Sequence, residues 1–443
     1  MRRFLLTLLL AAPTLHAAGL DADRQLASSL LAISQSRMPE ALTAVDQLTR
    51  QHPNFRLAHL VKGDLLLARV QPLQTLGNTS SARSADLDQL RDEARQRVRA
   101  LTDSLPNDRV PAYLLNLDDS YRHALVVDAS RSRLYVYANR AGLPIRVADF
   151  YVTIGKAGAG KQKQKEGDNR TPIGIYSVSS FKSPRELTDF YGSGAFTLSY
   201  PNEWDTRQGR NGHGIWIHGS PSSTYSRTPR ASEGCVVLAN GDLTRLGQYI
   251  QTGKTPVIIA EQIEWVAYDA LDARRDDLAA AIDQWRKDWE SRDTARLLSH
   301  YSASFRSESQ NLQAFAASKQ KVNAAKSWIK VGLNNLSLML YPQGADRGSK
   351  DAQASSTTLY PQGAGRGSKD AEASRTTLYP QGAGRGSKDA QASRTTLYPE
   401  RPDFALVRFV QDYQSNNLND RTAKRQFWSR ENGRWKIIHE TSL

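Results

Sequence analysis

Cysteine is almost absent from this chain of 443 residues, because Cys235 is the only one. A single cysteine excludes an intramolecular disulfide framework. No apolar run after the first 18 residues is long enough to cross a membrane, so we expect no transmembrane segment in the mature chain. The net charge is +14, yet no zinc-finger or RNA-binding signature and no basic helix with interleaved aromatic residues accompanies it. We therefore expect no nucleic-acid partner, while a basic surface also suits anionic lipid or an anionic wall polymer.

Residues 1–18 have the pattern of a signal peptide. Arg2 and Arg3 precede an apolar stretch at 4–12, and residues 17–18 are small alanines suited to cleavage. The apolar stretch is well short of the roughly 20 residues that a membrane-spanning helix needs. No cysteine follows it, which excludes a lipoprotein anchor. We expect the mature protein to be soluble and outside the cytoplasm.

The lone cysteine is a candidate nucleophile. Exported proteins usually pair their cysteines, so a single one is better explained as a reactive thiol than as a small buried hydrophobe. Gly234 directly before it and Ser232 nearby indicate an exposed turn. His218 lies seventeen residues earlier, at the end of a strand-like run at 215–217. An adjacent imidazole is the usual means of activating a thiol, so the pair predicts nucleophilic catalysis if the intervening loop folds back across the sheet edge.

Two other patterns are better explained without a ligand. His213 and His218 are five residues apart, so in a strand they point to opposite faces, and with Cys235 they leave a zinc shell incomplete. The Gly- and Lys-rich segment 156–166 lacks the GK[ST] end of a phosphate-binding loop, which favours a solvated loop. We expect neither a metal nor a cofactor.

The first domain is predicted to be α-helical and to span 19–116. Apolar residues recur at helical spacing from residue 23 to about 105, with Pro39 and Pro53 dividing the run. Two antiparallel helices around 52–54 resemble one tetratricopeptide-like hairpin. A single hairpin cannot bury its apolar face alone, so we expect it to dock on the next domain.

The second domain, at 117–264, is predicted to be mostly β and to carry the catalysis. One helix is expected at 242–251. Strands are predicted at 124–128, 133–137, 147–154, 174–179, 196–200 and 256–260.

The third domain, at 272–443, is predicted to be an α+β cone. An apolar helical stripe is formed by Leu278, Ile282, Trp285 and Trp289, and then by Leu297, Leu298, Tyr301 and Phe305. Strands follow at 328–331, 336–340, 404–413, 422–430 and 434–439. Helices followed by a curved antiparallel sheet resemble the nuclear-transport-factor-2-like (NTF2-like) fold, which implies a ligand-binding or docking role rather than a second active site.

A tandem repeat with a period of nineteen interrupts this third domain at 340–396. The units at 340–358, 359–377 and 378–396 are nearly identical, and each offers little apolar surface beyond a Leu-Tyr pair. Small residues and balanced charges favour disorder. We interpret the repeat as an expanded loop between two paired strands.

Three ordered sequence blocks resemble the L,D-transpeptidases, the YkuD-type enzymes of the bacterial cell wall. The blocks are Gly-Asp-Asn-Arg-Thr-Pro-Ile-Gly-Ile-Tyr at 167–176, Gly-Ala-Phe-Thr-Leu-Ser-Tyr-Pro-Asn at 194–202, and Ile-His-Gly at 217–219 with Ser-Glu-Gly-Cys-Val at 232–236. The chain departs from the family at two positions that usually line the substrate site. Glu233 stands where the family often has a histidine, and Val237 lies where it often has an arginine.

The resemblance implies acyl transfer on the tetrapeptide stems of peptidoglycan, in the periplasm and at the cell wall. Cys235 would form a thioester with the diamino-acid residue and release D-Ala, with His218 as the base. Backbone N–H groups at Gly234 and Cys235 would stabilise the oxyanion, Ser232 would orient the turn or the imidazole, and Gly219 would line the substrate site.

The step that resolves the thioester is left open by the resemblance. An amine of a neighbouring stem would give a cross-link, an amine on a lipoprotein would give an anchor, and water would give an L,D-carboxypeptidase. Carboxypeptidases with a similar C-terminal cone exist in the family. A catalytically weak wall-binding scaffold is the alternative outside enzymes, and cell-wall proteins are candidate partners of the helical and C-terminal domains.

Overall fold

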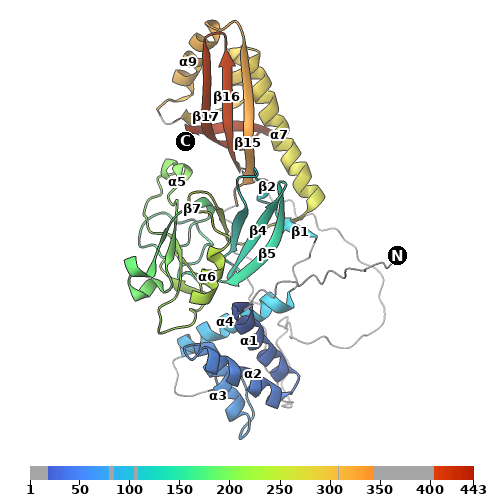
Figure 1. Ribbon diagram of the computed structural model, residues 1–443, viewed down its shortest axis with the longest axis vertical. Coiled ribbons are helices and arrows are strands. Elements are labelled where there is room, and N and C mark those ends of the chain that lie inside the picture. Colours follow the sequence, from blue (N-terminus) through green and yellow to red (C-terminus); the bar gives the residue numbers. More distant parts are fainter. Residues whose placement is uncertain (1–17, 79–83, 104–107, 308, 343–403) are drawn as a thin grey trace, which may run out of the picture.

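The computed structural model describes residues 18–78, 84–103, 108–307, 309–342 and 404–443. Three regions follow one another along the long axis of the molecule (Figure 1). They are a cluster of helices, a β-rich region in the middle, and a long helix packed on a curved sheet. This mixed, multidomain arrangement is the predicted fold class. The predicted signal peptide, apart from Ala18, and the repeat from residue 343 onward lie outside the described residues.

The helical region consists of α1 (Ala18–Ser34), α2 (Met38–Gln51), α3 (Arg56–Leu67) and α4 (Ser84–Thr102). Pro53 lies between α2 and α3, at the predicted break. Helix α1 packs on both α2 and α4, and the four helices share one core of buried aliphatic side chains and a phenylalanine. The predicted hairpin therefore buries its apolar face largely within its own region. Its likeness to a tetratricopeptide repeat stays a prediction.

The β-rich region is built on a sheet with the strand order β11-β9-β8-β7-β12-β3-β4-β5. Alternate residues of β3 enter two different cores: Leu125 and Val127 face the core of this region, and Ala124 and Val126 face the core shared with the C-terminal sheet. The predicted strand at 147–154 is divided between β5 and a short β6. The elements are β3 (His123–Asp128), β4 (Arg133–Arg140), β5 (Leu143–Tyr151), β6 (Ile154–Gly155), β7 (Gly174–Lys182), β8 (Ala195–Leu198), α5 (Glu203–Arg207), β9 (Trp216–His218), β10 (Arg230–Ser232), β11 (Val236–Val237), α6 (Asn240–Gly247) and β12 (Pro256–Ala260).

The segment after the helices contributes one strand to each of two further sheets. Strand β1 (Arg109–Pro111) pairs with β13 (Trp265–Ala267), and β2 (Leu114–Asn116) pairs with an edge of the C-terminal sheet. The last helix ends at Thr102, close to the predicted end of the helical pattern at about residue 105. A strand of three residues with a partner far along the chain leaves no periodic signal in the sequence.

The C-terminal sheet has the strand order β14-β18-β17-β16-β15-β2, and α7 packs on it. The predicted stripe of α7 is buried, from Leu278 to Trp289. Tyr301 and Phe305 were predicted to continue a helical stripe, but they lie in β14. The prediction failed because a spacing of four residues places side chains on one face of a strand as well as on one face of a helix. The elements are α7 (Tyr268–Glu290), α8 (Thr294–Leu298), β14 (Tyr301–Ser307), α9 (Leu312–Ala324), β15 (Ile329–Leu340), β16 (Phe404–Ser415), β17 (Leu418–Glu431) and β18 (Arg434–Ser442).

The two strands predicted at 328–331 and 336–340 form one strand, β15. Its pairing with β16 is irregular between Asn334 and Ser337, and Asn335 has a φ of 54° at this point. Asparagine adopts such left-handed backbone angles more readily than most residues. The local interruption therefore shifts the pairing register of the strand instead of ending it.

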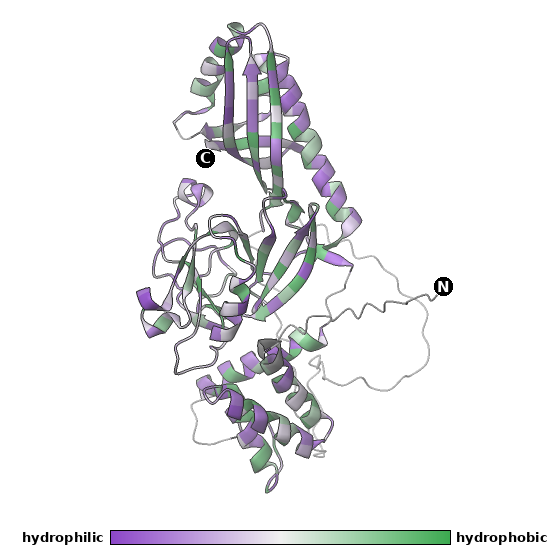
Figure 2. Cartoon of the chain, viewed as in Figure 1, coloured by the Kyte–Doolittle hydropathy of each residue, from purple (hydrophilic) through white to green (hydrophobic). Residues whose placement is uncertain are grey.

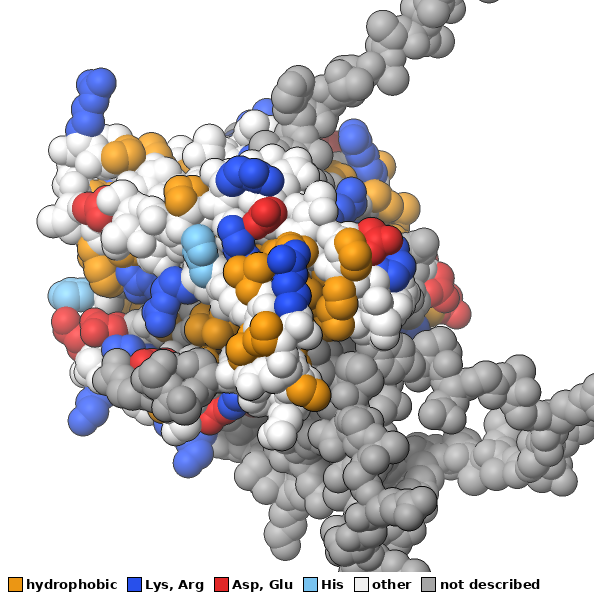
Figure 3. Space-filling view, turned by 90° about the horizontal axis from the view of Figure 1, so that it is seen from below, with side chains coloured by type: hydrophobic (Ala, Val, Ile, Leu, Met, Phe, Trp, Pro, Cys, Tyr) orange, Lys and Arg blue, Asp and Glu red, His pale blue; other side chains and the backbone are white. Residues whose placement is uncertain are grey.

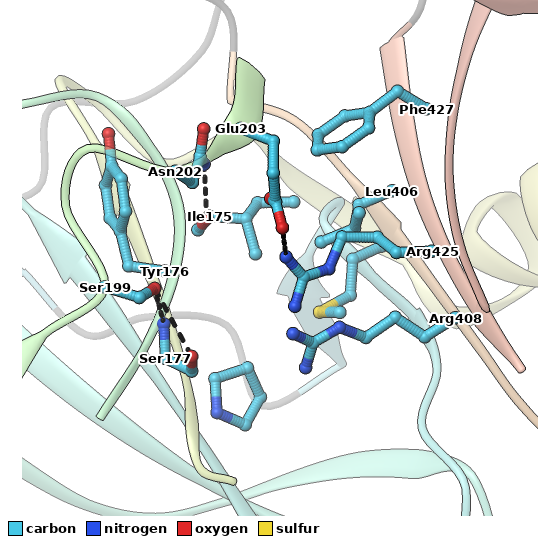
Figure 4. Close-up of a pocket in the computed structure, with 12 residues that line it drawn as sticks. Ile175, Tyr176, Ser177, Ser199, Asn202, Glu203, Leu406, Arg408, Arg425 and Phe427 are labelled. Atoms are coloured by element: carbon cyan, nitrogen blue, oxygen red, sulfur yellow. Dashed lines mark hydrogen bonds and ion pairs between the residues drawn. The ribbon is translucent and has the colours of Figure 1, made fainter. Parts of the chain in front are cut away.

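A polar junction holds the C-terminal sheet on the β-rich region (Figure 4). Glu203 forms an ion pair with Arg425. Asn202 donates hydrogen bonds to the Ile175 carbonyl at 3.0 Å and to the Tyr341 hydroxyl at 2.7 Å. Tyr341 belongs to the first repeat unit, which was predicted to be disordered from residue 340, so the beginning of that unit is packed structure.

The distribution of polar and apolar residues over the structure agrees with the sequence composition. Hydrophilic and hydrophobic bands alternate along the C-terminal strands (Figure 2), as expected for a sheet with one buried face. Basic and acidic side chains are interspersed with hydrophobic ones on the face shown in Figure 3. Within the described residues, no helix combines the length and the apolarity that a membrane span requires.

Deletion of residues 340–396 tests the interpretation of the repeat. Leu340 pairs with Ala405 between β15 and β16, so the strands that flank the repeat are neighbours, as an expanded loop requires. The deletion places residues 397–398, again Leu-Tyr, in the positions of the packed 340–341 pair. Because loop-closure entropy grows only logarithmically with length, we expect the shorter loop to raise the free energy of unfolding by about 1–2 kcal/mol.

Thermal unfolding of the deletion variant and of the full chain measures this effect. A variant that lacks only the middle unit, 359–377, is the matched control, and its melting temperature should lie between the other two. Loss of the cooperative unfolding of the C-terminal domain on deletion of the repeat would contradict the interpretation.

Candidate active site

The parallel pairing of β9 with β11 brings the cysteine and the histidine to one face of the sheet. Val236 lies opposite Ile217, Val237 lies opposite His218, and Cys235 immediately precedes β11. Side chains alternate along a strand, so Cys235, Val237 and His218 project from the same face. A strand spacing of about 4.8 Å and a rise of about 3.3 Å per residue place the Cα atoms of Cys235 and His218 roughly 8 Å apart.

Two hydroxyl groups shape the turn that presents the thiol. The Ser232 Oγ donates to the Cys235 carbonyl at 2.6 Å and accepts from the Gly234 N–H at 3.2 Å. The Thr171 Oγ1 donates to the Gly234 carbonyl at 2.9 Å and accepts from the Gly155 N–H at 2.9 Å. Thr171 belongs to the 167–176 block, so that block supports the turn before Cys235.

Gly234 is required by the shape of this turn. Its φ is 132°, and a Cβ at this position would lie 2.7 Å from the carbonyl oxygen of Arg170. A side chain would therefore meet both backbone strain and a steric clash. The predicted site residues Ser232 and Gly234 thus act on the conformation of the turn.

The imidazole of His218 is buried and held in one tautomer. Its Nδ1 lies 2.7 Å from the Gly219 carbonyl oxygen, which can only accept, so Nδ1 carries the proton and Nε2 is the free base. Burial lowers the pKa of His218 to about 4; the hydrogen bond to Gly219 opposes this shift and the charge of Arg227 adds to it. The rings of Phe190 and Tyr191 lie 5.8 and 5.0 Å from the imidazole, measured between centroids. His218 is therefore a neutral base at physiological pH.

Gly219 positions His218 through its backbone. A Cβ at Gly219 would lie 2.2 Å from the Asn240 Oδ1. That oxygen accepts from the N–H groups of Ser193 at 2.9 Å and Ser220 at 3.1 Å. Asn240 thus joins two loops behind the histidine, and it needs the space that a glycine leaves.

The thiol of Cys235 is partly exposed, and its Sγ donates to the Gly214 carbonyl at 3.2 Å. Burial raises its pKa, while a backbone hydrogen bond from Trp216 and the positive charges of Arg227 and Lys163 lower it. Because the thiol pKa is raised and His218 is neutral, the resting site is a thiol beside a neutral imidazole. Any use of this thiol as a nucleophile would therefore require the transfer of its proton.

The segment at 156–166, predicted to be a solvated loop, contains a buried cation. Lys163 has a side chain that is only 2% exposed and forms an ion pair with Asp168 at 2.6 Å. The Asp168 carboxylate also accepts from the N–H groups of Gln164 at 2.8 Å and Arg170 at 3.0 Å. The prediction is therefore wrong for Lys163, which is folded inward because a carboxylate five residues later closes the loop around it.

Sequence reasoning missed several residues that surround the pair. Thr171 lay within a recognised block, but its contact with the turn depends on the fold. Phe190, Tyr191, Arg227 and Asn240 occupy loops or helix ends, where no periodic pattern marks them.

The other polar residues near the motif are exposed. His213 has a side chain that is 80% exposed, and its Nδ1 lies 3.8 Å from the Glu166 carboxylate. Glu233 is 78% exposed at the side chain. In the part of the chain that the structure describes, no group of three or more His, Cys, Asp or Glu side chains is placed to hold a metal ion.

Two parts of the chain match known protein families. Residues 122–259 match the L,D-transpeptidase catalytic domain, YkuD, and this part contains both Cys235 and His218. Residues 277–353 and 389–441 match the Cds6 C-terminal NTF2-like domain. A comparison with curated proteins gives no match.

Two solved structures share the fold over most of the chain. Bd1075 of Bdellovibrio bacteriovorus is 24% identical, with a TM-score of 0.56, and the alignment covers 76% of this chain and 99% of that one. The helical cell shape determining protein Pgp2 from Campylobacter jejuni is 22% identical, with a TM-score of 0.52, and the alignment covers 74% of this chain and 95% of that one. At these identities the likeness concerns the fold. The chain thus joins a YkuD-type L,D-transpeptidase catalytic domain to a Cds6-type NTF2-like domain.

Proposed function

We propose that this protein is a peptidoglycan-modifying L,D-transpeptidase that acts on tetrapeptide stems through a thioester on Cys235 and releases D-Ala. The observation that carries the proposal is the pairing of β9 with β11 inside the YkuD domain. This pairing sets a partly exposed thiol on a glycine turn and a neutral His218 on the same face of the sheet.

In the first step, Sγ of Cys235 attacks the carbonyl carbon of the diamino-acid residue, and the thiol proton passes to Nε2 of His218. Nε2 is available because Nδ1 donates its proton to Gly219. The C–N bond to the terminal residue then breaks. The protonated imidazole returns its proton to the leaving amine, so D-Ala departs as a neutral amine and the thioester remains.

The developing oxyanion needs a donor close to the thiol. The Cys235 N–H forms no hydrogen bond with any described residue, which supports it as the donor. The Gly234 N–H already donates to Ser232, so we assign it to the turn instead. One donor of this kind typically contributes about 3 kcal/mol to the stabilisation of the transition state.

The fate of the thioester defines the specific activity. Attack by an amine gives a cross-link or an anchored protein, and attack by water gives an L,D-carboxypeptidase. We keep hydrolysis as the alternative because both routes share the first step. The fold likeness to a helical cell shape determining protein supports a contribution to cell shape.

We place the protein in the periplasm at the cell wall, which agrees with the predicted signal peptide and with a peptidoglycan-acting family. A cavity of about 650 Å³ between the β-rich region and the C-terminal sheet supports a ligand-binding or docking role for the NTF2-like domain. Its lining includes the basic residues Arg207, Arg306 and Arg425.

Incubation of the purified protein with a disaccharide tetrapeptide, followed by mass spectrometry, tests this function. D-Ala release with formation of a cross-linked dimer supports transpeptidation. D-Ala release with a tripeptide product selects the carboxypeptidase. Binding of peptidoglycan without any D-Ala release would contradict both activities and favour the scaffold.

A further inference from the structure

The loop between His218 and Cys235 carries an arginine that the proposed reaction does not use. The guanidinium carbon of Arg227 lies 4.6 Å from the centroid of the Phe190 ring. The same ring lies beside the imidazole of His218 and is 47% exposed, although phenylalanine is usually buried. An exposed phenyl ring and a cation therefore lie together next to the proposed base.

Arg227 is only partly in contact with water, and it forms no ion pair with a carboxylate among the described residues. Burial lowers its pKa, while the nearby charges of Cys235 and Glu233 act in the opposite direction. Arginine presents its N–H donors in a planar fork that matches a carboxylate. The geometry offers this fork to an incoming anion beside the Phe190 ring, which itself lies next to His218.

We propose that Arg227 binds the terminal α-carboxylate of the stem peptide, with the methyl group of the leaving D-Ala on Phe190. This inference rests on the proposed function and names its specificity. In a tetrapeptide, the terminal carboxylate belongs to the residue directly after the scissile carbonyl. One additional residue moves it farther by about 3.5 Å, so Arg227 selects tetrapeptide over pentapeptide stems.

The helical region holds the Arg227 loop on one side. The ring of Tyr225 packs against His52 and Phe55, with centroid distances of 4.5 Å to each. The Tyr225 N–H donates to the Asn54 carbonyl at 3.1 Å. The turn between α2 and α3 thus anchors the loop two residues before the arginine.

Both neighbours of Arg227 also contact α4. The Ser226 hydroxyl donates to the Glu93 carboxylate at 2.8 Å. The Thr228 hydroxyl donates to the side-chain oxygen of Gln89 at 3.3 Å. Helix α4 therefore restrains the backbone on each side of the arginine.

The β-rich region holds the loop from the other side. The carbonyl of Arg227 accepts hydrogen bonds from the Tyr151 hydroxyl at 3.0 Å and from the Thr153 hydroxyl at 2.9 Å. The backbone at this residue is thus tied to two regions of the chain, while its side chain lies over Phe190. The contacts of Tyr225, Ser226 and Thr228 with the helical region assign that region a role in positioning Arg227.

The test compares kcat/KM for D-Ala release from a tetrapeptide with a free C-terminal carboxylate and from the same peptide with a C-terminal amide. We expect the wild type to prefer the free acid by roughly 10- to 100-fold, as a charge-assisted contact implies. Arg227→Ala should bring this ratio close to one, and Arg227→Lys should keep part of it. Arg230→Ala, which removes an exposed arginine from the same segment, should behave like the wild type.

Three outcomes separate the hypotheses. An Arg227→Ala variant that folds, by its melting temperature, and keeps the preference for the free acid would overturn the inference. The inference would also be overturned if the effect of Arg227→Ala on kcat/KM disappeared when the diamino-acid carboxylate was amidated, and not when the terminal carboxylate was amidated. A wild type that releases no D-Ala from any stem would instead refute the proposed function.

Discussion

The Cys235→Ala variant is expected to release no measurable D-Ala from tetrapeptide stems, a loss of at least about 10⁴-fold by comparison with nucleophile removal in other acyl-transfer enzymes. The thioester needs a sulfur nucleophile, and the chain has no second cysteine to supply one. Cys235→Ser should be similarly inactive, because a neutral His218 with a pKa of about 4 is a weak base for a hydroxyl group. D-Ala release followed by mass spectrometry is the measurement.

The fold should tolerate the replacement. The side chain is partly exposed, and its hydrogen bond to the Gly214 carbonyl is a weak one for a thiol. The melting temperature should therefore change little. A thiol-directed acylating inhibitor should give one adduct on the wild type and none on the variant. An alanine variant that still releases D-Ala would eliminate the enzyme hypothesis.

Replacement of His218 by asparagine is expected to reduce kcat/KM by about 10²- to 10⁴-fold, the usual range for loss of a general base. The amide N–H₂ of asparagine can still donate to the Gly219 carbonyl, as Nδ1 does, but nothing replaces Nε2. This substitution therefore removes the base and keeps the local hydrogen bond. His213→Asn is the matched control, because His213 is exposed, and its activity should equal that of the wild type.

The pH profile of the wild type gives an independent measure of the same residue. Since burial lowers the pKa of His218 to about 4, the base stays deprotonated at pH 5 and becomes protonated only as the pH falls through about 4. The value of kcat/KM should therefore stay level from pH 7 to 5 and decline below that, with circular dichroism to confirm folding at each pH. An acidic limb near pH 6.5 in a folded protein would show that the imidazole is not buried as described.

Several features could be predicted because their signals are local. Short apolar runs on either side of a polar turn predict strands such as those at 124–128 and 133–137, and the stripe from Leu278 to Trp289 predicts a long amphipathic helix. Both were observed, as β3, β4 and α7. Where a spacing fits both periods, as for Tyr301 and Phe305, the local signal is ambiguous, and the prediction failed.

The candidate chemistry was also readable from the sequence. A single cysteine after a glycine, with a histidine seventeen residues earlier, predicts a reaction through the thiol, because an adjacent imidazole is the usual means of activating one. The three blocks around 167–236 named the family, and the family match at 122–259 agrees with them. None of these residues indicates which acceptor resolves the thioester.

The tertiary structure alone decided which distant residues meet. Strand β2 pairs with β15 across more than two hundred residues, and the loop with Arg227 packs between the helical region and the sheet. Such contacts depend on strand register and on loop paths, which no local pattern encodes. The sequence by itself therefore determined most regular elements and predicted the reactive residue types. The fold determined the tautomer of His218, the shape of the Gly234 turn and the place of Arg227, because each depends on backbone groups from elsewhere in the chain.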